Sequence, residues 1–265
     1  MKKFKYIFPL IFMLAVACEK VIDVDLNEAA PAIVIEGNLS NNINEVEVKI
    51  SKTSSYFDTL SSEKVSGAIV KVTSDVGDNF ILHETENGIY KTQKSWFKIG
   101  GTYNLSIEAN GENYEASSKL NTPVSIDSIN FYYEDSPFFE LGYYVNVYFD
   151  DPPNVSNYYR LKYLKNGIYQ NRIEDLILFD DRYMDGNTIE ITLLNQPFEL
   201  NDTVSFQLVS LDKGAYNYLK TFQELVNNNP GSAAPANPNS NISNGALGYF
   251  SAWSSSIKSA IIKWE

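Results

Sequence analysis

The chain has 265 residues and a formal net charge of −12, with 33 acidic residues against 21 lysines and arginines. A surface this acidic repels nucleic acid and anionic lipid headgroups, so the charge excludes a nucleic-acid-binding protein. One cysteine and one histidine exclude an internal disulfide and a zinc site built from several thiolates or imidazoles.

The N-terminus has the layout of a secretory signal peptide. Three lysines lie among its first five residues, and an apolar run follows from residue 6 to residue 14, which is too short for a helix that spans a bilayer. The next residues, AVAC, end at Cys18 and resemble the lipobox of bacterial lipoproteins, which is cut before its cysteine and acylated there. We therefore expect residues 1–17 to be removed and Cys18 to anchor the protein to a membrane. The alternative is an ordinary signal peptide in which Cys18 has no role.

Residues 18–30 are expected to form the acylated terminus and a tether, and residues 31–121 a β-sandwich. Aromatic residues make up 14% of the chain, which favours strands because tyrosine suits a half-buried pleated surface. Alternating segments recur with turn signals at spacings of about eight to twelve residues, which is typical of a sandwich. We expect strands at residues 32–39, 45–50, 65–72, 80–82, 103–109 and 113–117. The clearest hairpin turn is Asn110-Gly111, because both residues tolerate a positive φ.

Three motifs in this first half, VSGAIVKV, GIYKT and GGTYNLSI, resemble the transthyretin-like (immunoglobulin-like) sandwich of carboxypeptidase regulatory domains. Gly67, Gly88 and Gly101 occupy matching positions. The resemblance implies a fold and carries no chemistry of its own.

A second, larger β domain with one α-helix is predicted for residues 122–265, after a boundary marked by Pro123. Its expected strands span residues 126–133, 141–149, 158–164, 175–179, 188–194, 204–211, 247–253 and 257–264. Between the strands at residues 204–211 and 247–253 the apolar residues recur at helical spacing, which predicts a helix over residues 213–228 with Asp212 as its cap. A long loop rich in Asn, Pro, Ser and Gly follows at residues 229–246, and a loop of this length is commonly functional.

Several segments together resemble a Bacteroidota lipoprotein family known only as a domain of unknown function. They are CEKVIDVDL, IVIEGNLS, VSGAIVKV, PVSIDSI, FDDPPNVSNYYRL and the loop NPGSAAPANPNSNISNGALGYFSAWS. Members of this family are often encoded beside SusC-like TonB-dependent receptors. The resemblance therefore implies an outer membrane lipoprotein with such a receptor as its partner. Lys20, two residues after Cys18, favours the cell surface.

Candidate catalytic residues are scarce. His83 is the only histidine, and no serine lies in a nucleophile motif, so we interpret the protein as a non-enzyme. The pairs Asp150-Asp151 and Asp180-Asp181, with Asp185, offer oxygen ligands for Ca²⁺. They lack the EF-hand spacing and lie in predicted turns, where aspartate bonds to the backbone. We interpret them as turn residues and expect no cofactor, with calcium as the alternative.

The long loop is the candidate contact site for a partner or ligand, since a simple connection needs fewer residues. The residues that we expect to make this contact are Asn237, Pro238, Asn239, Asn241, Asn244 and Tyr249. The leading hypothesis is a non-enzymatic accessory of a TonB-dependent receptor that captures or caps ligand. The alternative is a free-standing surface protein that binds glycans or adheres to them through exposed members of its tyrosine pairs, such as Tyr143-Tyr144.

Overall fold

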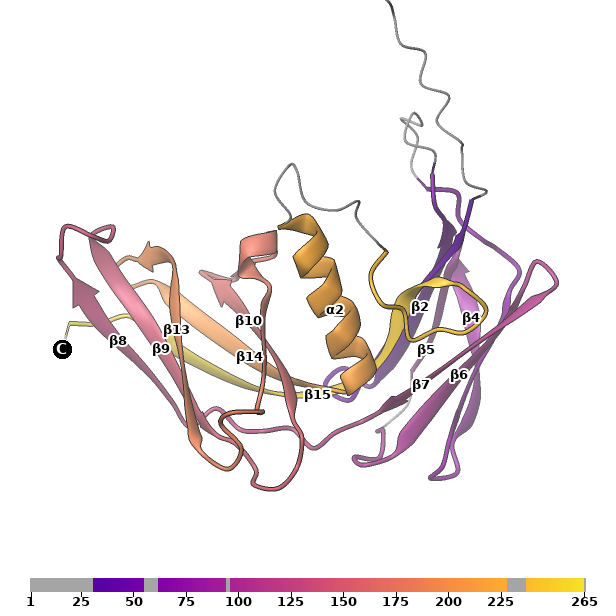
Figure 1. Cartoon of the computed structure of the whole chain (residues 1–265), viewed down its shortest axis with the longest axis horizontal. Helices are drawn as coiled ribbons and strands as arrows, with labels where there is room; N and C mark the ends of the chain where they lie inside the picture. The colour runs from indigo at the N-terminus through magenta and orange to yellow at the C-terminus, as the bar shows by residue number, and fades with distance from the viewer. Residues whose placement is uncertain (1–30, 55–61, 94–95, 228–236, 265) are drawn as a thin grey trace, which may run out of the picture. The chain divides into compact units, whose positions relative to one another are not determined.

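The chain folds mainly into β-strands, as its composition and alternation predict. The computed structural model describes residues 31–54, 62–93, 96–227 and 237–264 (Figure 1). Cys18, the expected signal peptide and the tether lie outside the described residues, and so do residue 228 of the predicted helix and residues 229–236 of the predicted loop. No helix within the described ranges is long and apolar enough to cross a membrane.

The first half of the chain forms a two-layered sandwich, as predicted. Its strands are β1 (Ile33–Ser40), β2 (Glu45–Lys52), β3 (Ile69–Ser74), β4 (Asn79–Glu86), β5 (Ile89–Gln93), β6 (Thr102–Ala109) and β7 (Glu112–Lys119). One layer contains β1, β2 and β5, the other β3, β6 and β7, and β4 pairs with both β3 and β5. Burial alternates along β6 and β7, so their apolar residues and Ser118 face inward and their other polar residues face outward.

The second half forms another pair of facing sheets. Its elements are β8 (Ser128–Glu134), β9 (Gly142–Asp150), β10 (Tyr158–Lys165), β11 (Ile168–Tyr169), the 3₁₀ turn η1 (Ile173–Asp175), β12 (Ile177–Asp180), β13 (Thr188–Phe198), β14 (Thr203–Leu211), α2 (Lys213–Val226) and β15 (Leu247–Ile261). β13, β9 and β8 make a three-stranded sheet, while β10, β11, β12 and β14 belong to the sheet that contains β15. Both sheets contribute to a second core, in which Val147 and Phe149 meet Tyr159 and Phe206.

The last strand, β15, belongs to both halves of the structure. Residues 247–253 pair in parallel with β1, and residues 254–261 pair antiparallel with β14. The two strands predicted for residues 247–253 and 257–264 are therefore a single strand (Figure 1). The first core also includes Ile242 and Phe250, so the sandwich predicted for residues 31–121 is completed by residues from the C-terminal end. The boundary at Pro123 separates two cores but not two self-contained stretches of sequence.

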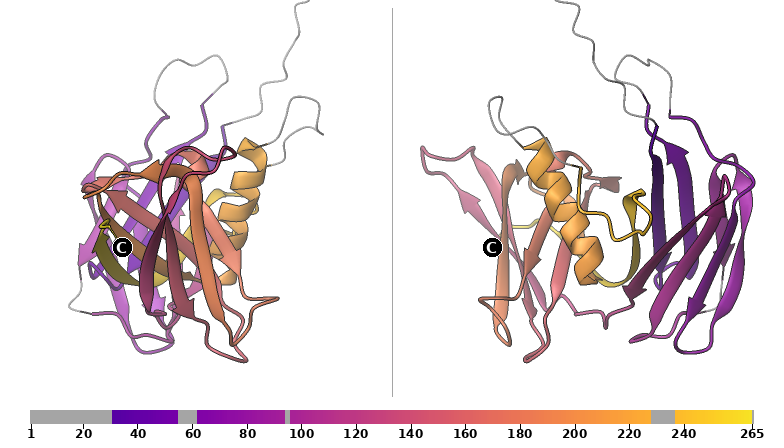
Figure 2. Two further views of the ribbon diagram at one scale, coloured as in Figure 1. Left: turned by 90° about the vertical axis from the view of Figure 1, so that its left-hand side faces the viewer. Right: turned by 45° about the vertical axis from the view of Figure 1, so that its right-hand side comes forward.

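Helix α2 begins where the sequence predicts. The side chain of Asp212 accepts hydrogen bonds from the backbone N–H groups of Gly214 and Ala215, which satisfies two donors of the first turn. Ser118 on β7 donates its hydroxyl to the same carboxylate and accepts from the backbone N–H of Ala252 on β15. Burial raises the pKa of Asp212. The helix packs against β15, β10 and β12 (Figure 2).

The predicted turn at Asn110-Gly111 adopts the expected conformation. Asn110 and Gly111 have φ values of 53° and 81° and join β6 to β7. Asn166 and Gly167, with φ values of 51° and 78°, join β10 to β11. Positive φ at both central residues gives the twist that a tight hairpin requires.

Candidate functional site

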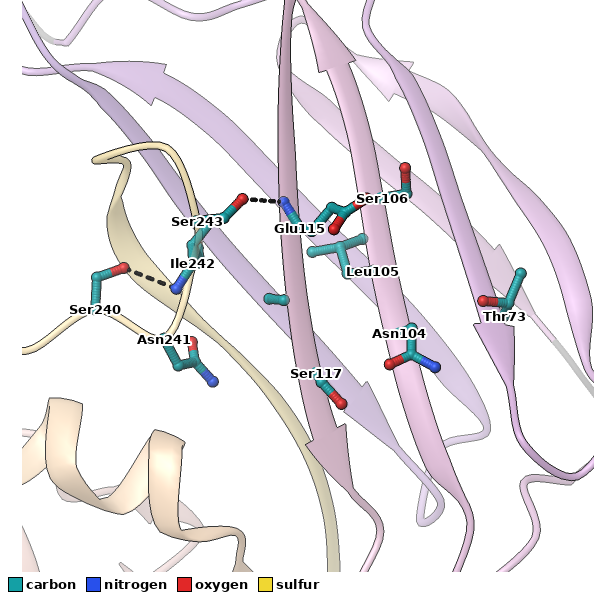
Figure 3. A pocket seen from close by; sticks show the side chains of 11 residues that line it. Thr73, Asn104, Leu105, Ser106, Glu115, Ser117, Ser240, Asn241, Ile242 and Ser243 are labelled. Atoms are coloured by element: carbon teal, nitrogen blue, oxygen red, sulfur yellow. Dashed lines mark hydrogen bonds between the residues drawn. The ribbon is translucent and has the colours of Figure 1, made fainter.

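A groove of about 710 Å³ lies between the outer face of the first sandwich and the segment that precedes β15. Its volume is in the range of small-ligand sites. The residues that line it come from β3, β6, β7 and that segment, and they are Thr73, Asn104, Leu105, Ser106, Glu115, Ala116, Ser117, Ser240, Asn241, Ile242 and Ser243 (Figure 3). The predicted contact loop therefore supplies one wall of the groove.

The loop wall is joined to the edge strand β7 by backbone pairing. Ile242 forms an isolated antiparallel bridge with Ala116. The backbone N–H of Ser243 donates to the carbonyl of Glu115 at 2.8 Å, and the N–H of Glu115 donates to Ser243 Oγ at 2.8 Å (Figure 3). Because β7 ends its sheet, these bonds use backbone groups that an edge strand otherwise leaves unpaired.

Side chains of Asn241 and Asn244 and the backbone of Asn239 hold the loop against the elements on either side. Asn241 donates from Nδ2 to the carbonyl of Phe250 at 2.8 Å and accepts at Oδ1 from the N–H of the same residue at 2.9 Å. The N–H of Asn239 donates to Thr221 Oγ1 on α2 at 2.9 Å. The amide of Asn244 donates to Glu112 Oε2 at 3.1 Å. These three asparagines therefore tie the loop to β15, α2 and β7.

Of the six predicted contact residues, Asn241 alone is among the described residues that line the groove. Tyr249 lies on β15, where its ring packs against Tyr218 of α2 with centroids 4.8 Å apart. Burial raises the pKa of both phenols, that of Tyr218 to about 12, so both rings stay neutral. Asn237 is exposed and Pro238 half-buried at the first described residues of the segment.

Sequence reasoning missed the other wall of the groove. Asn104, Ser106, Glu115 and Ser117 are outward-facing residues of β6 and β7, and their alternation with apolar residues showed only that they are exposed. That the loop lies beside them depends on the bridge between Ile242 and β7, which no local pattern reveals.

The chemistry of the groove is that of neutral hydrogen-bonding groups. Glu115 is the only ionisable residue among the described lining residues, and the others offer hydroxyls, amides and small apolar patches. Such a surface suits a neutral polar ligand or an extended polypeptide. His83 is exposed on β4, opposite Lys91 of β5, and does not line the groove.

The predicted aspartate pairs separate in the structure. Asp150 accepts from the hydroxyl of Thr188 at 2.5 Å, and Asp180 accepts from Arg182 at 2.9 Å and from Tyr216 at 3.1 Å. Asp151, Asp181 and Asp185 instead converge, with one carboxylate oxygen of each within 4.8 Å of the others.

The tyrosine pairs do not all divide between core and surface as predicted. In the pair Tyr143-Tyr144 both rings are buried, at 6% and 2% exposed. The reason is the neighbourhood of β9, since Tyr144 stacks on Tyr132 of β8 at 6.0 Å and contacts Phe139 of the β8–β9 loop at 6.1 Å. Tyr133 of β8 is 54% exposed, and its ring contacts that of Tyr143 with centroids 5.2 Å apart.

Comparisons with known proteins show the family of the chain. A search of curated proteins finds no match. The solved structure of the Yersinia pseudotuberculosis adhesin InvE matches with 12% sequence identity and a TM-score of 0.22, over 67% of this chain and 55% of that one. The chain thus spans about half of the adhesin, and the similarity is too weak to support an inference. The profile described as Domain of unknown function (DUF4249) matches residues 19–259. Since this match covers most of the sequence, the chain belongs to the DUF4249 family.

Proposed function

We propose that the protein is a lipid-anchored, non-enzymatic accessory of a TonB-dependent, SusC-like receptor in the outer membrane of a Bacteroidota cell. In this role it faces the cell surface and captures or caps ligand at the mouth of the receptor. The observation that carries the proposal is the groove whose wall is the long loop. The described part of this loop, residues 237–246, has backbone pairs to β7 and side-chain bonds to β15, so it presents a fixed shape, which suits recognition better than a simple connection does.

The position of the family match supports the anchor. The match begins at Glu19, the residue after the expected lipidation site. Everything before Cys18 then lies outside the family domain, as expected of a signal peptide that is removed. Multiple acyl chains on Cys18 provide stable membrane attachment, whereas a single chain is marginal.

Replacing Cys18 with alanine tests the anchor. We expect the Cys18→Ala protein to leave the membrane fraction or to accumulate as an uncleaved precursor, because the thiol that accepts the lipid is gone. Fractionation of cells followed by immunoblotting measures this. A variant that is still processed and stays with the membrane would contradict the lipid anchor.

Filling the groove tests its role in receptor binding. Ser117 lines the groove from the exposed face of β7, so Ser117→Trp should obstruct it without disturbing the core. We expect the amount of receptor that co-purifies with the protein to fall at least about tenfold, which corresponds to about 1.4 kcal/mol of binding free energy. Co-purification from solubilised outer membranes is the measurement.

The matched control is Lys119→Trp, two residues along the same face of β7 and not among the lining residues. It should co-purify the receptor at the unmodified level, and both variants should keep their thermal stability because exposed substitutions have small effects. Equal receptor recovery from the two variants would show that the groove does not contact the receptor.

A second candidate function is a free-standing glycan-binding lipoprotein. The neutral hydroxyl and amide lining of the groove favours it, since sugars are recognised by such groups. Cells that lack the receptor separate the two functions. Retention of glycan by these cells, and its loss in Ser117→Trp, supports the free-standing protein, whereas loss of binding together with the receptor supports the accessory.

A further inference from the structure

Three aspartates converge at one end of the sheets in the second half of the chain. They belong to the β9–β10 and β12–β13 connections. Asp151 follows β9, Asp181 follows β12, and Asp185 lies in the turn that leads to β13. One carboxylate oxygen of each lies within 4.8 Å of the others. Asp151 and Asp181 are buried, at 3% and 5% exposed, while Asp185 is exposed. The cluster therefore has two buried anionic groups and one side open to solvent.

The three carboxylates have no cationic partner in the part of the chain that the structure describes. The nearby guanidinium of Arg182 pairs with Asp180 instead, at 2.9 Å. Buried carboxylates are normally paired with a cation or bound to a metal ion, because an uncompensated buried charge is costly.

Hydrogen bonds hold the carboxylates in this arrangement. Asp151 accepts from the hydroxyl of Tyr159 at 2.5 Å and from the N–H of Gly186 at 3.1 Å. Asp181 accepts from the N–H of Asn157 at 2.7 Å, and Asp185 accepts from the N–H of Asn154 in the β9–β10 connection at 2.8 Å. An ionised carboxylate has about four acceptor positions, so each group keeps lone pairs that can bind a further ligand.

An independent feature is the orphan side-chain oxygen of Asn157. This residue is 7% exposed, and its Oδ1 is buried without a hydrogen-bond partner among the described residues. Tyr158 pairs with Asp180 in the β10–β12 ladder, and the N–H of Asp181 donates to the carbonyl of Asn157 at 3.3 Å, so Asn157 stands opposite Asp181.

The β10–β12 register places the side chain of Asn157 on the same face of the sheet as the aspartate cluster. Residues directly opposite each other on antiparallel strands share a face of the sheet, with Cβ atoms about 4.5–5.5 Å apart. Tyr159, two residues after Asn157, lies on the same face and donates to Asp151. Asn157 Oδ1 is therefore a buried acceptor without a donor, beside three carboxylates without a cation. A single ion can satisfy all four groups.

We propose that Asp151, Asp181, Asp185 and the side-chain oxygen of Asn157 bind a calcium ion. Carboxylate and amide oxygens are hard ligands, which favours Ca²⁺ over zinc or copper. Ca²⁺ accepts six to eight oxygens in irregular geometry, so waters at the exposed side next to Asp185 complete its shell, whereas Mg²⁺ requires a near-ideal octahedron. The ion links the β9–β10 and β12–β13 connections.

Calcium-dependent stability tests this site. The full chain, extracted in detergent and treated with EDTA, is melted with and without 1 mM CaCl₂, and metal content is measured before chelation. Because the site exists in the folded protein and not in the unfolded chain, we expect calcium to raise the Tm by about 5 °C. Asp185→Asn, which alters the exposed member, should fold and lose most of this rise. Asp181→Asn should lose it as well.

The matched control is Asp150→Asn, which removes a neighbouring carboxylate that bonds to Thr188 outside the cluster. It should keep the full calcium response. The proposal is overturned if calcium leaves the Tm of the unmodified chain unchanged, if Asp185→Asn responds like the unmodified chain, or if 1 mM MgCl₂ gives an equal rise.

Discussion

Replacing Gly248 with alanine is expected to prevent β15 from completing the first sandwich. A Cβ atom at this position would lie 2.0 Å from the carbonyl oxygen of Ile35 and 2.8 Å from its carbonyl carbon. Both atoms belong to the backbone of β1, the strand with which this half of β15 pairs, so no side-chain rotation can relieve the overlap. The φ of Gly248 is also +98°, a value that side chains with a Cβ rarely adopt.

The expected loss for Gly248→Ala is more than about 4 kcal/mol in the free energy of unfolding, which is exceptional for a single substitution. Urea unfolding monitored by tryptophan fluorescence measures it, and protein that is recovered only as aggregate agrees with the same expectation. The matched control is Gly111→Ala, which has a similar φ of +81° and no atom within 4 Å of the added Cβ. The control should lose only the backbone strain of about 1–3 kcal/mol. Equal losses in the two variants would contradict a steric requirement for glycine between β1 and β15.

Replacing Lys162 with methionine is expected to stabilise the protein at pH 7. Lys162 lies on β10, and its ammonium group stands 4.8 Å from the ring centroid of Trp253. Burial is the main cause that lowers its pKa to about 8, and the charge of Arg160, on the same face of the strand, contributes to this shift. A lowered pKa means that the folded protein holds the proton less strongly than the unfolded chain does. The charged lysine therefore costs stability below about pH 8, and the cost declines as the pH rises toward the ordinary lysine pKa.

The expected gain for Lys162→Met is about 1–2 kcal/mol at pH 7, after the loss of the cation–π contact is subtracted. The gain should shrink by pH 9.5, where the folded protein carries Lys162 mostly neutral. Chemical unfolding at both pH values measures this, with Lys119→Met on the exposed face of β7 as the control that should change little at either pH. A gain of the same size at pH 7 and pH 9.5 would indicate better packing and not relief of a buried charge.

Local signals in the sequence determined much of the secondary structure. Alternation identified β6 and β7 as a hairpin, and Asn110-Gly111 marked its turn because that turn needs positive φ. Asp212 marked the start of α2, since a side-chain oxygen there accepts from the first turn. These features depend on residues within a few positions of one another, which is why they could be predicted without the fold.

The tertiary structure alone decided which distant segments meet. Periodicity shows which face of a strand is buried but not which strand lies beside it, so nothing in residues 247–261 indicated that one strand would pair with both β1 and β14. The groove depends on the pairing of Ile242 with Ala116, which lie 126 residues apart in the sequence. Asp151 and Asp181 looked like ordinary turn residues, and only the β10–β12 register brought Asn157 and its unpaired oxygen to them. Sites of this kind form from side chains far apart in sequence, so they become visible only when long-range pairing is known.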